Sequence, residues 1–314
     1  MRTLKIGKIK FENPFFLAPM VDITDFAYRK ICRDAGAGMA YTEMIHVDAL
    51  MNQNDFVRKK ILIISEEKKP VGIQITSNKV EKLKKAVKYL EKFDVVDLNC
   101  GCPSELTIDH GSGSYLLKSP NKIKKMIQIL KDSGFTTTAK IRLGFNKNNV
   151  LEVSKKIESA GADAITVHGR LATENNSVPV NYSWIKKVKE NVNIPVIGNG
   201  DISSPEKAKE MFDKTNCDGI MLGRGALGNP YLFTRINSSI NKQKEIKFDF
   251  KKNISYFIEY LSLLKKYDFI KMQRIKYVGG NFFREISGSA KLREKFMKLK
   301  TFEEIEEFTK EMIK

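Results

Sequence analysis

Eight short apolar runs, separated by longer amphipathic stretches, constrain the fold of this chain more than any other feature. The runs are continuous rather than alternating, which is typical of strands buried on both faces of a parallel sheet. We expect strands at residues 15–20, 39–45, 70–76, 95–100, 137–143, 164–168, 194–198 and 219–223. Eight β units, each followed by a helical stretch, predict an α/β fold of the (β/α)8 or TIM barrel class; an open doubly wound sheet is the alternative.

Local signals support this order of elements. Residues 78–93 repeat their apolar side chains at spacings of three and four, as an amphipathic helix does. Residues 119–134 and 203–216 both carry Ser-Pro near their start, a combination typical of helix N-termini. The segment LKIGKIKF at residues 4–11 predicts a short hairpin that closes the N-terminal end of the barrel.

The pattern changes after about residue 240, where strand-like runs stop. Apolar residues recur at helical spacing over 254–272 and 301–313. We therefore expect two domains, a barrel over residues 1–240 and a small all-helical domain over residues 241–314.

The charge is strongly positive, with 55 Lys and Arg against 37 Asp and Glu and a formal net charge of +18. Such an excess attracts polyanions, nucleic acid foremost. An AT-rich genome would also enrich Lys, Asn and Ile and is the competing explanation. Residues 242–300 carry 16 Lys and Arg against 6 Asp and Glu, so much of the excess lies outside the barrel, which weakens that explanation.

Other classes of protein are disfavoured. No apolar run approaches the ~20 residues of a membrane span, and the N-terminal residues show no signal peptide. Four scattered cysteines do not make a disulfide framework in a chain of 314 residues. We expect a cytoplasmic protein with no membrane association.

Polar residues gather where the predicted strands end, which is where barrels carry their chemistry. A Gln and a Lys inside apolar strands are costly unless they meet a polar partner. A structural network would explain one such residue, whereas several favour a bound polar ligand. The strand ends in question are Ala18–Met20, Thr42–Met44, Gln74, Asn99–Cys102, Lys140–Arg142, His168–Arg170, Gly198–Asp201 and Gly223–Gly225.

Two glycine-rich turns follow the seventh and eighth strands, the place where barrels commonly bind phosphate, and each is expected to precede a helix N-terminus. Arg224 could pair with the anion. The sequence GRGALG at residues 223–228 also matches the G-x-G-x-x-G motif of dinucleotide-binding proteins. That motif requires a βαβ unit, and the charged helical sequence that follows does not form one. We interpret the turns as a mononucleotide phosphate site.

Cys100 and Cys102 stand at the end of the fourth strand. The chain has three His and no second cysteine pair, so we expect no metal site. Cys100 ends the strand and is expected to be buried, and a disulfide between the two would be strained. Cys102 precedes Pro103 in the loop, where its thiol could face a ligand as a nucleophile or as an acid.

At these residues the chain resembles the tRNA-dihydrouridine synthase family of flavin enzymes. The resemblance implies an FMN-binding barrel followed by a helical tRNA-binding domain. It also implies that NADPH, or NADH, reduces FMN, and that the flavin then reduces the 5,6 double bond of a uridine in tRNA. The matching segments are LAPMVDITDFAYRKICRDAGA (17–37), DLNCGCPS (97–104), GSGSYLLKSP (111–120), KIRLG (140–144), ITVHGR (165–170), PVIGNGDI (195–202) and DGIMLGRGALGNPYLF (218–233).

The resemblance also implies residue roles. Cys102 would deliver a proton to C5 of the uracil while hydride reaches C6, Asn99 would contact the flipped base and the flavin, and Arg170 would contact the substrate. Lys140 would neutralise negative charge on the reduced flavin. The implied flavin contacts are Gln74, Lys140 and His168 at the ring and ribityl chain, Ala18, Pro19 and Met20 against the isoalloxazine, and Asn199, Gly200, Asp201, Gly223 and Arg224 at the phosphate.

Two departures from the family pattern concern substrate contacts. Leu171 and Ala172 follow the HGR motif where many members have Thr and a second Arg, and Glu105 and Leu106 stand in a loop that is often basic. Two alternatives stay open: an FMN barrel acting on a free small molecule such as a dihydropyrimidine, and a tRNA-binding protein without catalysis. The basic helical segment opposes the first alternative, and the presence of Cys102 with Lys140 and His168 opposes the second. We expect a monomer.

Overall fold

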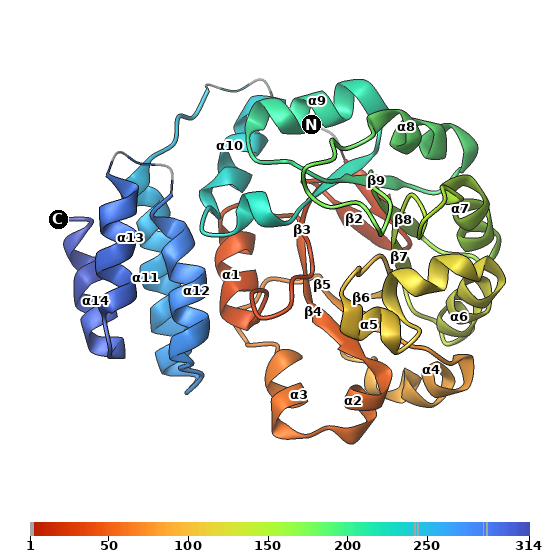
Figure 1. Ribbon diagram of the computed structural model, residues 1–314, viewed down its shortest axis with the longest axis horizontal. Helices are drawn as coiled ribbons and strands as arrows, with labels where there is room; N and C mark the ends of the chain where they lie inside the picture. The colour runs from red at the N-terminus through yellow and green to blue at the C-terminus, as the bar shows by residue number, and fades with distance from the viewer. Residues whose placement is uncertain (1–2, 242, 244, 285, 287) are drawn as a thin grey trace.

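The fold is built around a closed barrel of parallel strands (Figure 1), in a computed structural model that describes residues 3–241, 243, 245–284, 286 and 288–314. The order around the barrel is β10-β3-β4-β5-β6-β7-β8-β9, so the predicted (β/α)8 fold is confirmed and the open sheet is excluded. The strands are β3 (Phe15–Leu17), β4 (Met39–His46), β5 (Val71–Thr76), β6 (Val95–Cys100), β7 (Thr137–Arg142), β8 (Ala164–His168), β9 (Val196–Asn199) and β10 (Gly219–Leu222).

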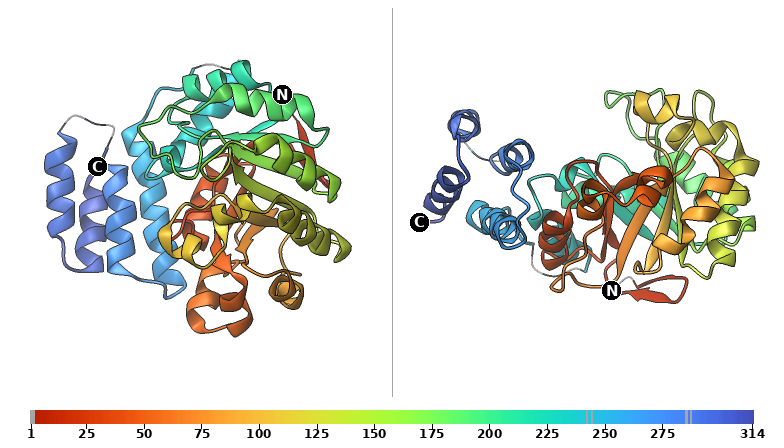
Figure 2. Two further views of the ribbon diagram at one scale, coloured as in Figure 1. Left: turned by 45° about the vertical axis from the view of Figure 1, so that its right-hand side comes forward. Right: turned by 90° about the horizontal axis from the view of Figure 1, so that it is seen from below.

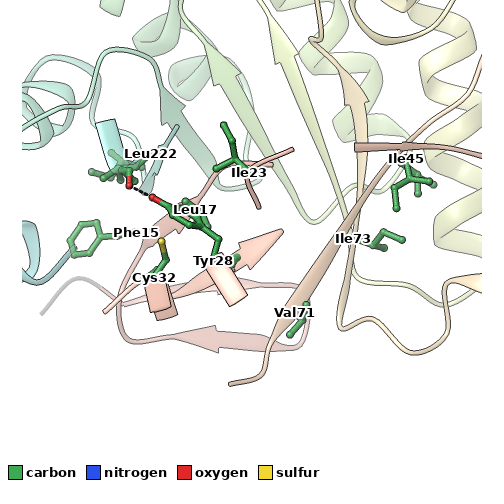
Figure 3. Packing of buried hydrophobic residues seen from close by; sticks show 14 of the residues in the cluster. Phe15, Leu17, Ile23, Tyr28, Cys32, Ile45, Val71, Ile73 and Leu222 are labelled. Carbon is green, nitrogen blue, oxygen red and sulfur yellow. Dashed lines mark hydrogen bonds between the residues drawn. The ribbon is translucent and has the colours of Figure 1, made fainter. Parts of the chain in front are cut away.

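Both faces of these strands are buried, which is why their apolar runs are continuous. Phe16 points into the barrel interior, whereas Phe15 and Leu17 belong to the layer between the strands and the outer helices. Figure 3 shows part of that layer, including Tyr28 and Cys32 from the first helix. Successive side chains therefore alternate between two apolar environments rather than between core and water.

Helices connect the strands and cover the outside of the barrel (Figure 1). They are α1 (Phe26–Asp34), α2 (Val47–Asn52), α3 (Asp55–Lys60), α4 (Val80–Ala86), α5 (Glu105–Asp109), α6 (Pro120–Asp132), α7 (Val150–Ser159), α8 (Tyr182–Asn191), α9 (Pro205–Thr215) and α10 (Tyr231–Ile240), with short 3-10 helices η1 (Val87–Tyr89), η2 (Gly113–Lys118) and η3 (Arg224–Ala226). The two Ser-Pro signals mark true starts, since α6 and α9 each begin at the proline.

The helix predicted over residues 78–93 is shorter than expected. Its α-helical part is α4, which tightens into η1 and ends where the backbone N–H of Leu90 donates to the carbonyl of Val87. Leu90 is fully buried, so this turn carries an apolar side chain into the core instead of extending the helix along the surface.

A short antiparallel hairpin, β1 (Leu4–Ile6) and β2 (Ile9–Phe11), lies at one end of the barrel (Figure 2, right). Leu4, Ile6 and Phe11 are buried in one cluster with Phe16 and Met39 of the barrel interior. The predicted plug is therefore confirmed, and the opposite, C-terminal end of the strands is the open one.

Four helices follow the barrel in the residues that the structure describes, and they lie on the side of it that carries α1 (Figure 1). Instead of one helix over 254–272, the chain forms two, because Asp268 adopts a left-handed backbone (φ 49°) and reverses the direction of the chain. In the described part of the chain, no helix is long and apolar enough to cross a membrane. The helices are α11 (Phe250–Lys266), α12 (Met272–Phe282), α13 (Ser289–Lys298) and α14 (Phe302–Glu311).

A buried ionic cluster joins these helices to the barrel. Arg274 of α12 donates from Nη1 to Asp25 Oδ2 (3.2 Å) and from Nη2 to Glu43 Oε1 (3.1 Å). Lys60 donates to the other oxygen of Glu43 (2.6 Å), and the Tyr260 hydroxyl donates to Asp25 (3.1 Å). Both carboxylates are fully buried. We call these five residues the junction cluster.

Candidate active site

A cleft of about 580 Å³ opens at the carboxyl ends of the barrel strands. Its walls come from segments after β3, β9 and β10 and from the last residues of β7 and β8. Every predicted cofactor-binding residue except Gln74 lines it, and Arg284 of the C-terminal segment closes one side. The lining residues are Ala18, Pro19, Met20, Lys140, His168, Asn199, Gly200, Asp201, Ile202, Ser203, Met221, Gly223, Arg224, Gly225 and Arg284.

Glycines at one end of the cleft are required by close approach. A Cβ on Gly225 would lie 2.0 Å from the carbonyl oxygen of Ile202, and Gly200 has a positive φ of 126°. A Cβ on Gly223 would instead meet nothing nearer than Ala18 at 3.8 Å, which itself lines the cleft. Any side chain at Gly223 would therefore project into the space that a ligand would need.

The turn after β10 differs from the expectation of a helix N-terminus. The short 3-10 helix η3 starts at Arg224, and the next α-helix begins only at Tyr231. The turn after β9 does lead into a capped α-helix, since Ser204 accepts a bond from the backbone of Lys207 at the start of α9. The two glycine-rich turns thus present backbone groups in different geometries.

Arg170 and Asp201 are joined to each other. Arg170 is 1% exposed, and its guanidinium makes a two-pronged ion pair with the Asp201 carboxylate, including Nη1 to Oδ1 at 3.0 Å. Arg224 Nη2 donates to the same carboxylate at 3.4 Å. The carboxylate therefore orients two arginines, and the structure directs the Arg170 guanidinium toward Asp201 rather than into the cleft.

Lys140 and His168 bring a basic wall to the cleft. Burial lowers the pKa of Lys140 to about 8, with the charge of Arg142 adding to the effect and Asp97 opposing it. Burial also lowers the pKa of His168 to about 2, with Lys140 next in effect, so the imidazole is neutral at physiological pH. Within the described residues, the buried Nδ1 of His168 has no hydrogen-bond partner.

Gln74 and Asn99 lie below the cleft in a chain of hydrogen bonds. Gln74 is 1% exposed; its Nε2 donates to Asp97 Oδ2 and its Oε1 accepts from Asn99 Nδ2, both at 2.7 Å. Asn99 Oδ1 accepts from the backbone N–H groups of Gly101 (3.0 Å) and Cys102 (2.9 Å). These internal bonds leave each side-chain amide one N–H for a ligand.

The two cysteines of the motif have different surroundings, as predicted from the sequence. Cys100 is fully buried, and burial raises the pKa of its thiol well above the ordinary range. Cys102 is partly exposed, and its Sγ lies 3.6 Å from Thr107 Oγ1 on α5. Ser104 caps α5 and also lies 2.8 Å from the Thr107 hydroxyl. Cys102 is thus the more accessible of the two thiols, although it is not among the residues that line the cleft.

Sequence reasoning missed Asp97, and it named Arg142 as a strand end without giving it a role. Asp97 anchors the chain of amides, and Arg142 donates to the carbonyls of Gly101 and Leu171, both at 2.9 Å. Both lie two positions from a predicted residue of the same strand, Asp97 from Asn99 and Arg142 from Lys140. Because side chains two apart share a strand face, this spacing was a usable signal.

The remaining histidines lie outside the cleft. His46 and His110 face each other with ring centroids 6.5 Å apart, and burial lowers the pKa of His46. Among the described residues, no three His, Cys, Asp or Glu side chains are grouped so that they could hold a metal ion.

Comparisons with known proteins identify relatives along most of the chain. A family model described as dihydrouridine synthase (Dus) matches residues 16–314. tRNA-dihydrouridine synthase B of Pasteurella multocida is 36% identical over 245 residues, 76% of this chain and 73% of that protein. A probable tRNA-dihydrouridine synthase of Aquifex aeolicus is 31% identical over 263 residues, 82% of this chain and 81% of that protein.

Solved structures resemble the fold at low sequence identity. Histamine dehydrogenase from Rhizobium sp. 4-9 matches with a TM-score of 0.57 at 16% identity, covering 83% of this chain and 50% of that one. A 6-hydroxypseudooxynicotine amine oxidase from Pseudomonas geniculata matches with a TM-score of 0.59 at 13% identity, covering 76% and 49%. These neighbours support the barrel fold, and the match of the family model over residues 16–314 shows that the chain belongs to the dihydrouridine synthase family.

Proposed function

We propose that this protein is a tRNA-dihydrouridine synthase, which reduces the C5=C6 bond of a uridine in tRNA with FMN as its flavin and NADPH or NADH as electron donor. The observation that carries the proposal is the partly exposed Cys102, whose backbone N–H donates to Asn99 and which lies close enough to Lys140 of the cleft wall to influence its pKa. The names of the relatives from Pasteurella multocida and Aquifex aeolicus point to the same reaction.

The cleft fits a flavin in two respects. Gly223 keeps the wall open where a Cβ would fill it, and the Nδ1 of His168 is buried without a partner among the described residues. We assign the ring to Ala18–Met20, Lys140 and His168, with Gln74 beneath, and the phosphate to Asn199, Gly200, Gly223 and Arg224. Asp201, being anionic, would hold Arg224 in place rather than touch the phosphate. The bound flavin would supply the hydride that adds to the uracil.

Lys140 supplies positive charge to this wall. With a pKa of about 8, it is mostly protonated at neutral pH. Its ammonium would stabilise negative charge that develops on the ring system beside it, because a fixed charge in a half-buried site is weakly screened. The neutral imidazole of His168 adds a hydrogen-bonding group without adding a second cation.

Cys102 is the proposed general acid. Its thiol would give a proton to C5 of the uracil, and the neighbouring hydroxyl of Thr107 would hold the side chain in position. Asn99 would contribute its one remaining N–H to the base or the flavin. To reach the Cys102 thiol and the flavin together, the base would leave the tRNA stack, at a cost of a few kcal/mol that protein contacts would offset.

A groove beside the cleft suits a polyanion with exposed bases. It has a volume of about 710 Å³, and the described residues that line it include Lys271, Lys276 and Arg274 against a single acid, Asp22. They also include three exposed apolar side chains, Val21 (48% exposed), Tyr277 (54%) and Met297 (51%). Arg284 lies between this region and the flavin cleft, since it lines the cleft and also a pocket shared with Tyr277. Cations next to an exposed aromatic ring are the usual features of a single-stranded nucleic-acid contact. We propose residues 241–314 as the tRNA-binding domain on this basis.

The test is single-turnover oxidation of the reduced protein. Purified protein should be yellow, and its reduced flavin should be oxidised by unmodified tRNA but not by free uridine or uracil. Cys102→Ala should keep the flavin and lose at least about 100-fold in the oxidation rate, whereas Cys100→Ala, the matched control, should stay close to wild type. A colourless protein would contradict the flavin assignment, and oxidation by free uridine would favour the small-molecule alternative.

We also propose that the enzyme is monomeric, metal-free and cytoplasmic. Light scattering of the holoprotein would give its mass, and elemental analysis would detect a bound metal. Reduction rates with NADPH and NADH would identify the preferred donor. A dimeric mass or a stoichiometric metal would overturn the corresponding part.

A further inference from the structure

Asp97 is a buried carboxylate that none of the roles above uses. It lies in β6 and is 1% exposed. Its Oδ1 accepts from the hydroxyl of Thr138 (2.6 Å) and its Oδ2 from the amide of Gln74 (2.7 Å). The two donors are uncharged and come from the strands on either side, β7 and β5, so the carboxylate ties three neighbouring strands together below the cleft.

The bonds that start at Asp97 have a fixed direction. An ionised carboxylate only accepts, so Gln74 must turn its NH2 group toward Asp97 and its oxygen toward Asn99. Asn99 must then present its own NH2 to Gln74 and its oxygen to the backbone N–H groups of Gly101 and Cys102. Those N–H groups only donate, so the two ends of the series require the same orientation of both amides.

The last member of the series holds the reacting thiol. Asn99 Oδ1 accepts from the N–H of Cys102 itself, while the Cys102 carbonyl accepts from the backbone N–H of Ser114 in η2 (3.0 Å). If the side-chain amide of Asn99 rotated by 180°, its NH2 group would face the backbone N–H groups of Gly101 and Cys102. Both N–H groups would then lose their acceptor. The position of Cys102 therefore depends on the orientation of the Asn99 amide. Asp97, two residues earlier in the same strand, favours that orientation through Gln74.

We propose that Asp97 is a positioning residue for Cys102, acting through Gln74 and Asn99, whose amides it orients. The inference rests on the proposed function, in which the Cys102 thiol donates a proton to the uracil. Asp97 touches neither substrate nor flavin in this assignment. Its effect should therefore be larger in the oxidation of the flavin by tRNA, which needs the Cys102 thiol, than in the reduction of the flavin by NADPH, where only the contact of Gln74 with the ring is disturbed.

Two substitutions at one position separate this role from a general effect of the side chain. Asp97→Asn keeps an oxygen for Gln74, and its NH2 can donate to the Thr138 hydroxyl, so the orientation of the amides survives. Asp97→Leu is similar in size but removes the acceptor. We expect Asp97→Leu to slow single-turnover oxidation by tRNA by about 10- to 100-fold, as small misplacements of a reacting group do. Asp97→Asn should stay within about threefold of wild type, and Asp97→Leu should keep its flavin and lose less in the rate of reduction by NADPH than in the rate of oxidation by tRNA.

A double variant tests whether the effect passes through the thiol. If Asp97 acts by positioning Cys102, then Cys102→Ala/Asp97→Leu should be no slower than Cys102→Ala alone. A further loss of the same size as in the wild-type background would overturn the inference.

Other outcomes are also decisive. If wild-type reduced protein is not oxidised by tRNA, the proposed function fails; if wild type and Asp97→Leu are oxidised equally fast, only the present inference fails. Asp97→Val, whose side chain is favoured in strands, is the second variant should Asp97→Leu not fold. Parallel losses of flavin binding, reduction and oxidation in every folded variant would assign Asp97 to folding and overturn a positioning role.

Discussion

The junction cluster and the cleft both bury carboxylates of the barrel, but they satisfy them in opposite ways. At the junction, Asp25 and Glu43 meet the cations of Arg274 and Lys60. Below the cleft, Asp97 accepts its bonds from uncharged groups of neighbouring strands. Matched charges hold one element against another, whereas a carboxylate among neutral donors imposes a direction on the amides around it.

The electrostatic consequences differ as well. Burial raises the pKa of Asp97 to about 6, and the hydrogen bonds from Thr138 and Gln74, followed by the charge of Lys140, offset this only in part. At the junction the guanidinium keeps a pKa above its ordinary value, because the attraction of Asp25 and Glu43 exceeds the cost of its burial. Burial raises the pKa of the junction carboxylate Asp25 as well, with Arg274 opposing the shift. The junction therefore differs from the cleft mainly in its sensitivity to the loss of a charged partner.

The largest effect should come from breaking the junction. Arg274→Met leaves the buried Asp25 and Glu43 without their guanidinium, and removing one partner of a buried ionic cluster typically costs about 3–5 kcal/mol. Urea denaturation followed by circular dichroism would measure the loss. Arg58→Met, at an exposed arginine of α3, is the matched control and should change the free energy of unfolding by less than about 0.5 kcal/mol. Equal effects of the two substitutions would refute the special status of the junction.

An effect of intermediate size is expected from Asp97 on the pH dependence of the free energy of unfolding. Its pKa rises from 3.8 to about 6 on folding, so the native protein binds a proton that the unfolded chain has already lost. This contribution makes stability fall as pH rises from about 4 to about 6, by at most about 3 kcal/mol. Asp97→Asn should remove that part of the slope.

Urea unfolding at several pH values between 4 and 8 would reveal the difference between wild type and Asp97→Asn. Asp132→Asn, at an exposed position of α6, should leave the slope unchanged. A wild-type slope that persists in Asp97→Asn would show that other groups, Asp25 among them, account for it.

The smallest effect should come from an ion pair that is not buried at all. Lys298 and Glu294 lie 2.7 Å apart one turn from each other on α13, with both side chains more than half exposed. Because water and salt screen such pairs, Lys298→Gln should cost no more than about 0.5 kcal/mol. The difference in stability between Lys298→Gln and wild type should vanish in 1 M salt. A larger loss, or one that salt does not reduce, would contradict the expectation that exposed ion pairs matter less than the junction cluster.

The barrel could be predicted because its strands are buried on both faces and therefore read as continuous apolar runs. The junction could not, since Arg274 meets Asp25 and Glu43 across 249 and 231 positions of the chain. Nothing in the local pattern around Arg274 sets it apart from the many basic residues near it. Asp268, which separates α11 from α12, was equally unremarkable, because its left-handed backbone leaves no mark on apolar spacing.

The sequence predicted which residues line the cleft, but not which hydrogen bonds their side chains make. Ala18–Met20, Lys140, His168 and the glycine-rich turns do line one cleft, as expected for strand ends of a barrel. The sequence alone did not indicate that the Arg170 side chain points toward Asp201. Nor did it indicate that the amides of Gln74 and Asn99 form hydrogen bonds with each other and with neighbouring groups of the protein. The direct contacts assigned to these residues stay predictions, because they depend on side-chain directions that spacing does not specify.

The hairpin at the base of the barrel has a consequence for proton supply. In the part of the chain that the structure describes, Leu4, Ile6 and Phe11 fill that base, so the strand ends meet water through the mouth. Under the proposed function, a tRNA seated on the mouth covers the same opening. Cys102 would then have to be protonated before the tRNA binds. After it has given its proton to the uracil, it could be reprotonated from water only once the product has dissociated. Each visit of a tRNA would thus be limited to one uridine.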